Sequence, residues 1–158
     1  MKELIAYRQA LLAALESTIE QLTLTVNAMP STAWHQPYGL DSHTPHCVLA
    51  HIRELEAEWF AVQLPRLQSE SAPVLPACTK KGWMGNHYQP DEPIADILNE
   101  FSNLRRQELA WLRTLSSGDW SGIARHPWYG IHTLQWWVEY QLDLSQQHLK
   151  ELVSVPGM

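Results

Sequence analysis

The chain has 158 residues, 45% of them hydrophobic, and a formal net charge of −6, values that fit one globular domain over residues 1–158 with a sizeable core. Only 11 residues are Lys or Arg, and no basic run extends beyond Lys80 and Lys81, which argues against nucleic acid and anionic membranes as partners. No apolar run approaches the roughly 20 residues of a membrane span, and residues 1–10 lack a signal-peptide core, so we expect a cytoplasmic protein.

The first predicted element is a long helix over about residues 2–28. Its apolar residues recur three, four and seven positions apart from Leu4 to Val26, and neither Gly nor Pro interrupts them before Pro30. Residues 29–45 then contain three prolines and one glycine, a composition typical of turns. This stretch should carry the chain back beside its first helix.

A second helix is predicted from Pro45 to about residue 64. Thr44 is a suitable N-cap, and proline is favoured at the first helical position that follows. Pro65 removes a backbone donor, so the helix should end or kink there. His51 lies at or near the inward face, which is marked by the apolar positions Val48, Ile52, Leu55, Trp59 and Val62.

The connection over residues 69–91 is rich in proline and glycine and shows no lasting periodicity. Loops of this length are uncommon in compact domains and tend to be functional or mobile. Trp83, His87 and Tyr88 could therefore form a lid over a pocket. An aromatic loop that merely covers one side of the bundle explains these residues equally well.

A third helix is predicted between Asp91, a suitable N-cap, and Gly118, followed by a turn-like stretch. Its positions at helical spacing are Ile94, Ile97, Leu98, Phe101, Leu104, Glu108, Trp111, Leu112 and Leu115. A fourth helix should run from Thr133 to Leu152. Its inward stripe consists of Leu134, Trp137, Gln141, Leu144, His148 and Leu152.

These elements predict an all-α four-helix bundle with long connections between helices 2 and 3 and between helices 3 and 4. His148 on the inward stripe must find a hydrogen-bond partner, a metal or water, because burial of an unsatisfied imidazole is unfavourable. A bundle core can also hold a metal between facing helices, and imidazoles suit zinc or nickel.

A catalytic metal usually has three protein ligands, but only His51 and His148 face the core in suitable positions. Leu144, four residues before His148, cannot bind a metal, and Gln141 is a poor ligand. Glu54 and Glu58 could contribute a carboxylate, although glutamates on a solvated face are the stronger interpretation. The remaining histidines near helix starts are more typical of capping or surface positions; they are His43, His46, His126 and His132.

Other large enzyme classes find no support in the sequence. No GxSxG motif and no glycine-rich phosphate loop is present, and Cys47 lies in an apolar helix with no charge arranged to lower its pKa.

Three segments resemble the signatures of the DinB-like (DinB/YfiT) family of proposed metal-dependent four-helix-bundle proteins. They are TPHCVLAHIRELEAEWF at residues 44–60, RHPWYGIHTLQWWVEY at residues 125–140, and HLKEL at residues 148–152. Their order and spacing agree with the family. The resemblance implies a bundle of this type, a homodimer, and a pocket between helices 2 and 4.

The same resemblance implies that His51 is the first metal ligand of the family and His148 the last, with the middle ligand at position 144. Because that position is Leu144, this chain is a divergent member with an incomplete triad. Members with intact ligands resemble metal-dependent enzymes that use low-molecular-weight thiols. Loss of one ligand should leave zinc or nickel weakly bound or absent.

Three hypotheses follow. The first is a pocket around His51 and His148 that binds a small molecule, with a divalent metal weak or absent. The second is an active metal-dependent hydrolase or thiol S-transferase whose substitute third ligand is Glu54, Glu58, Gln141 or His87. The third is a non-catalytic structural or partner-binding dimer in which both histidines are core residues.

Overall fold

The apolar repeats at the two ends of the chain form its two longest helices, α1 (Lys2–Ala28) and α8 (Leu134–Val153). The computed structural model describes residues 1–77 and 87–158. Helix α8 begins within one residue of its predicted start, and Thr133 is its N-cap, because the Thr133 hydroxyl accepts a hydrogen bond of 3.2 Å from the backbone N–H of Trp136. On the predicted inward stripe of α8, Leu144 is partly buried and the other five residues are buried.

The second helix begins as predicted but contains an irregular turn. It consists of α2 (Pro45–Glu54), the π-helix η1 (Leu55–Phe60) and α3 (Ala61–Gln63), followed by α4 (Arg66–Ser69). The backbone N–H of Ala61 donates to the carbonyl of Glu56, five residues earlier. The additional residue in this turn changes which face points inward. Val62, predicted on the apolar stripe, is 54% exposed, whereas Phe60 and Leu64 are buried.

The third helix, α6 (Ile94–Leu112), begins later than predicted. Pro93 occupies the N-cap position with extended backbone, so Asp91 lies in the preceding turn and does not cap the helix. The stretch interpreted as turn-like contains α7 (Ser117–Trp120) and an antiparallel hairpin of β1 (Ile123–His126) and β2 (Gly130–Thr133). The two strands are too short for the alternation of apolar residues to reveal them.

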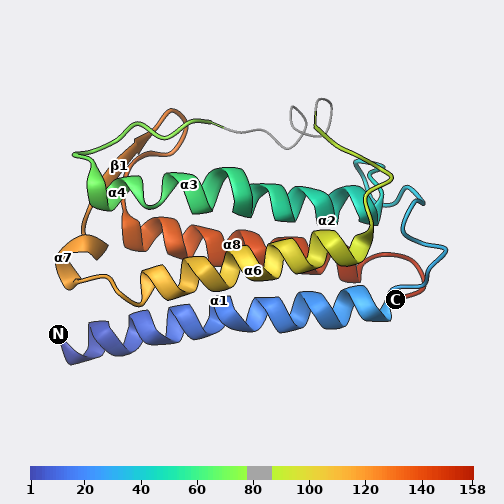
Figure 1. Ribbon diagram of the computed structural model, residues 1–158, viewed down its shortest axis with the longest axis horizontal. Coiled ribbons are helices and arrows are strands. Elements are labelled where there is room, and N and C mark those ends of the chain that lie inside the picture. Colours follow the sequence, from blue (N-terminus) through green and yellow to red (C-terminus); the bar gives the residue numbers. More distant parts are fainter. Residues whose placement is uncertain (78–86) are drawn as a thin grey trace.

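The four long helices form a bundle in which α1 and α8 run in one direction and α2 and α6 in the other (Figure 1). Helix α1 packs against α8 and α6, and α2 packs against α6 and α8. Because α2 and α6 are parallel, the chain after α4 must return along the length of the bundle before α6 can begin. Near the start of this return, Val74 forms a parallel bridge with Arg125 of β1.

The core lies between these helices and continues under the hairpin. Its largest fully buried side chains include Trp137, Phe101, Leu15, Leu22, Leu49 and Leu64. None of the helices in residues 1–77 and 87–158 combines the length and the apolar character that a membrane crossing requires. Residues Cys78 and Trp83, the latter predicted as part of a lid, lie outside the described part of the chain.

Candidate functional site

The structure brings His51 of α2 and His148 of α8 together across the bundle. Their ring centroids lie 5.6 Å apart with the ring planes at 84°, and both side chains are buried. Two imidazoles that share a tetrahedral ion at nitrogen distances near 2 Å would have centroids about 5 Å apart. The spacing of the pair is therefore compatible with a common metal ion.

The described residues, as placed, do not provide the third position of such a site. Leu144 occupies the turn of α8 before His148 and packs against the core. Within residues 1–77 and 87–158, no group of three His, Cys, Asp or Glu side chains is placed to hold one ion. As placed, these described side chains offer two ligands to a common ion, His51 and His148, and a third would require Glu54 or Glu58 of the neighbouring cavity to move toward them.

A cavity of about 180 Å³ opens beside His51. In the described part of the chain its polar lining comes from His51, Glu54 and Glu58, and no Lys or Arg lines it. Trp59 and Pro76 form part of the wall, and the Trp59 indole N–H donates to the Pro76 carbonyl at 2.9 Å. The π-turn therefore carries one wall of the cavity, and such turns occur frequently at functional sites.

The two glutamates of the cavity interact with each other. Burial, together with a hydrogen bond and the negative charge from Glu58, raises the pKa of the Glu54 carboxyl above its ordinary value. Arg53 opposes this shift through a contact of 3.4 Å with Glu54. The cavity therefore concentrates negative charge beside an imidazole, an arrangement that favours a cation.

On the inner side of His148 there is almost no free space. A void of about 10 Å³ lies between His148, Thr18 and Ser145. A cavity needs roughly 10–15 Å³ to hold one water molecule. Among the described residues, the side of His51 is therefore the side that has room for a small molecule.

Arg53 ties α2 to the segment that leads into α6. Its guanidinium forms two hydrogen bonds to Glu92, of 2.6 and 2.8 Å, and one of 2.8 Å to Glu100. His46 holds the same segment, because its Nε2 donates to the Glu92 carbonyl at 2.7 Å and its Nδ1 accepts from the Tyr88 hydroxyl at 2.6 Å. Both ring nitrogens of His46 are thus engaged.

The other histidines at the bundle ends also have structural positions. His126 is buried, and its Nδ1 accepts from the backbone N–H groups of Trp128 and Tyr129. Burial lowers the pKa of His126. His132 stacks on Trp136 with ring centroids 3.7 Å apart. The sequence predicted capping or surface positions for these histidines. His126 does bind backbone N–H groups, but His46 and His126 are both buried, so the surface interpretation is wrong for these two residues.

A second polar assembly, which we call the Arg105 cluster, fills the centre of the bundle with side chains from all four long helices. It comprises Thr18, Glu56, Arg105, Glu108, Gln141 and Ser145. Arg105 donates to Thr18 at 2.8 Å and to Glu56 at 3.1 Å, and the Gln141 amide donates to Glu56 at 3.1 Å and Glu108 at 2.8 Å. Gln141, a predicted substitute ligand, is therefore committed to this cluster.

The two carboxyl groups of the Arg105 cluster differ in protonation. Burial, followed by the charge and hydrogen bond of Glu56, raises the pKa of Glu108 well above its ordinary value. Burial alone would raise the pKa of Glu56 too, but Arg105 and hydrogen bonds from Glu108 and Gln141 hold it below its ordinary value. A protonated Glu108 beside an ionised Glu56 leaves the cluster with no net charge, as its deep burial requires.

Sequence reasoning did not find this cluster, although one signal was present. Glu108 occupies a position on the predicted apolar stripe of the third helix, where a carboxyl needs a buried partner. Glu56 gave no comparable signal, because it turns inward where the π-turn begins.

Comparison with known proteins agrees with this architecture. Residues 14–152 match the model of the DinB superfamily. The chain belongs to the DinB superfamily. No curated protein sequence matches this DinB-superfamily chain.

Among solved structures, the chain is similar to YfiT from Bacillus subtilis, a probable metal-dependent hydrolase with an unusual four-helix-bundle topology. The TM-score is 0.82 at 20% sequence identity, over 92% of this chain and 85% of YfiT. At this identity the similarity establishes the shared fold. It confirms the predicted DinB/YfiT type of bundle.

Proposed function

We propose that this DinB-superfamily protein binds a small, positively charged molecule in the cavity beside His51, and that it binds divalent metal weakly or not at all. The observation that carries the proposal is the pairing of Glu54 and Glu58 in that cavity. Arg53 contacts Glu54 at 3.4 Å, but no described Lys or Arg lines the cavity itself, and Arg53 is also bound to Glu92 and Glu100. An ammonium group placed between them would satisfy both carboxylates, and His51 would accept or donate a further hydrogen bond.

The size of the cavity limits the ligand. Its volume of about 180 Å³ is below the roughly 300 Å³ at the lower end of pockets for drug-sized molecules. A small amine, or the amine end of a longer molecule, fits this space. The indole of Trp59 supplies an aromatic wall, which suits a cationic ligand with an apolar part.

The test compares two probes of the same shape, benzylamine and benzyl alcohol, by isothermal titration calorimetry. We expect the amine to bind at least about tenfold more tightly, because only the amine forms charge-assisted hydrogen bonds. Glu54→Gln and Glu58→Gln should remove this preference, while Glu20→Gln, at an exposed position on α1, should not. Equal affinity for the two probes would reject the proposal.

The metal part of the proposal has a separate test. Protein that is incubated with excess nickel or zinc and then dialysed should retain clearly less than one equivalent. The expectation rests on Leu144 at the third ligand position. Stoichiometric metal that resists a chelator would overturn it.

A second candidate is a metal-dependent hydrolase or thiol S-transferase in which Glu54 or Glu58 replaces the missing ligand. It is favoured by one observation, that both glutamates line the same cavity as His51. In that case zinc or nickel should raise the melting temperature, because a ligand that binds the native state stabilises it. The rise should disappear in His51→Ala and in His148→Ala, and no shift in the unmodified protein would reject this candidate.

A further inference from the structure

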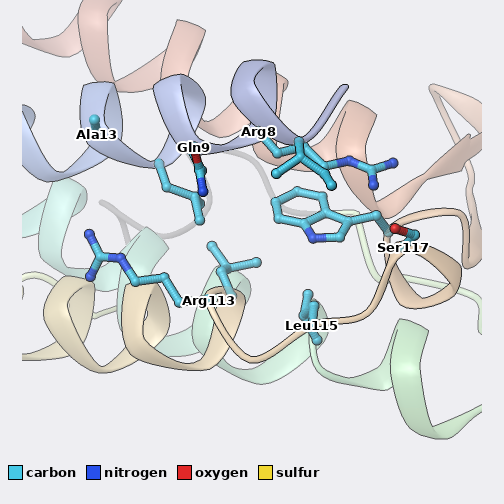
Figure 2. Close-up of a pocket in the computed structure, with 10 residues that line it drawn as sticks. Arg8, Gln9, Ala13, Arg113, Leu115 and Ser117 are labelled. Atoms are coloured by element: carbon cyan, nitrogen blue, oxygen red, sulfur yellow. The ribbon is translucent and has the colours of Figure 1, made fainter. Parts of the chain in front are cut away.

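The cavity at the other end of the bundle lies between the first half of α1, the end of α6 and α7 (Figure 2). Its volume is about 400 Å³, within the range of about 300–1,000 Å³ typical of small-molecule sites. Its apolar lining includes Leu12, Leu112 and Trp120. The N-terminus and α7 lie together at one end of the bundle (Figure 1). This cavity and the one beside His51 share no lining residue, so they are separate.

The cavity contains a buried arginine, Arg8, that has no carboxylate partner among the described residues. Arg8 is only 9% exposed, its Nε donates to the Gln135 side chain at 2.9 Å, and its guanidinium carbon lies 5.3 Å from the ring centroid of Trp120. Across residues 1–77 and 87–158, Arg8 forms no ion pair, and its two terminal nitrogens find no protein acceptor. A guanidinium carries five N–H donors, so most of the donors of Arg8 remain available.

Burial of an arginine in this way lowers stability unless another group accepts its hydrogen bonds and balances its charge. Arginine is rarely this buried without an anionic partner, because the free energy lost when the guanidinium leaves water is normally offset by a nearby negative charge. The other described long basic side chains with little exposure, Arg53 and Arg105, both contact carboxylates. The stacking on Trp120 offsets part of the cost at Arg8 but supplies no negative charge.

The rest of the lining has no compensating charge. No Asp or Glu in the described part of the chain lines the cavity. Arg113, the second arginine, already binds Glu16 at 2.8 Å. Figure 2 shows Arg8 extending toward the side where Ser117 lies, whereas Arg113 points to the opposite side. The anion-accepting end of the cavity is therefore the one formed by Arg8 and Ser117.

We propose that this cavity binds a small organic monocarboxylate with a compact apolar body. The carboxylate accepts two hydrogen bonds from the terminal nitrogens of Arg8, the geometry for which a guanidinium is suited. The Ser117 hydroxyl lies on the same side and donates a third. The apolar body fills the space between Leu12, Leu112 and the face of Trp120.

The test measures binding of 4-phenylbutyrate by isothermal titration calorimetry, with 4-phenylbutan-1-ol as the uncharged probe of the same shape. The carboxylate should bind at least about tenfold more tightly than the alcohol. Arg8→Gln should reduce its affinity by about tenfold or more. Arg113→Gln is the matched control, and it should leave the affinity within about twofold, because that arginine is already paired.

A second variant keeps the test decisive if Arg8→Gln does not fold. Arg8→Lys keeps the charge but loses the paired donors, and we expect it to bind the carboxylate with intermediate affinity. His51→Ala should have no effect, which separates this site from the cavity of the proposed function. Equal binding of the acid and the alcohol would overturn the proposal, as would the absence of saturable binding or an affinity that depends on Arg113 and not on Arg8.

Discussion

The Arg105 cluster and the His51–His148 pair are neighbours in the same bundle, because Ser145 of the cluster lies three residues before His148 on α8. They differ in how much free space surrounds them. The cluster is closed from solvent and its charged groups are joined by side chains from all four long helices. The histidine pair borders a cavity on the side of His51, and Leu144 occupies the turn of α8 before His148.

This difference places the residues that stabilise the fold, in the Arg105 cluster, apart from those that we propose bind a ligand, in the cavity beside His51. A buried ion pair stabilises a protein only when all of its hydrogen-bond partners are in place. The Arg105 cluster therefore favours one position of the four helices along each other. With the helices held in this way, the residues around His51 can change without loss of the fold. Leu144, at the position where the family resemblance predicts a metal ligand, would be an example of such a change.

The largest expected effect comes from Leu144→His. It would place two histidines four residues apart on α8, facing His51, and thereby complete three ligands. Metal retained after dialysis against zinc-free buffer, measured by atomic emission, should rise from clearly below one to about one equivalent per chain. Leu142→His, two residues away on another face of α8, is the control, and equal metal content in both variants would contradict the site geometry.

The second effect concerns the two carboxyl groups of the Arg105 cluster. Glu56→Gln removes the ionised partner of Arg105 and should lower the free energy of unfolding by about 2–4 kcal/mol, since Glu108 can ionise and replace it only in part. Glu108→Gln resembles the protonated carboxyl and should change stability by about 1 kcal/mol or less. Urea denaturation measures both, and equal losses would show that the assigned protonation states are wrong.

The pH dependence of stability should show the same asymmetry. Above the ordinary glutamate pKa of 4.5, folded Glu108 keeps a proton that the unfolded chain has lost, so stability should decrease as pH rises toward the raised pKa. Glu56, whose pKa is lowered, acts in the opposite sense and loses its stabilising charge as pH falls below 4.5.

Unfolding free energies measured from pH 5 to 8 test this difference, because this window lies above the ordinary glutamate pKa of 4.5. Glu108→Gln should flatten the decrease toward high pH, because the variant has no proton to retain. Glu54 also has a raised pKa and contributes to the same slope. An unchanged slope in Glu108→Gln would assign the whole dependence to other groups.

The smallest expected effect on stability concerns the start of α8, the helix that carries residues of both the Arg105 cluster and the His51–His148 pair. Thr133→Ala removes the N-cap hydrogen bond and should lower the free energy of unfolding by about 1 kcal/mol. Ser17→Ala, at an exposed position within α1, is the control and should stay within about 0.5 kcal/mol. Both variants should keep the pH dependence of the original protein, and a changed pH profile in Thr133→Ala would mean that the cap affects the Arg105 cluster.

The helices were predictable because their signals are local. The apolar repeats of α1 and α8, and the caps at Thr44 and Thr133, depend only on residues a few positions apart. The inward position of His148 followed from the same periodicity. The homodimer remains a prediction, as does the role of the two histidines as metal ligands.

The hairpin, the π-turn and the Arg105 cluster were not predictable in this way. Ile123–His126 and Gly130–Thr133 are short strands whose partners are each other and the segment near Val74. The π-turn at Leu55–Phe60 shifts the inward face, so periodicity placed Val62 in the core and overlooked Glu56. The contacts of the Arg105 cluster join residues far apart in sequence, whereas the hairpin and the π-turn are local but lack a periodic apolar pattern that would reveal them.

The amino-acid sequence by itself determined that there are four long helices and that His51 and His148 point inward, because side-chain spacing along a helix is set by the backbone. Only the tertiary structure decided that Glu56, Arg105 and Glu108 share one buried site, and that Arg8 lies buried over Trp120 without a carboxylate in the described chain. Burial and charge pairing depend on which helices meet, and that is a property of the packed bundle.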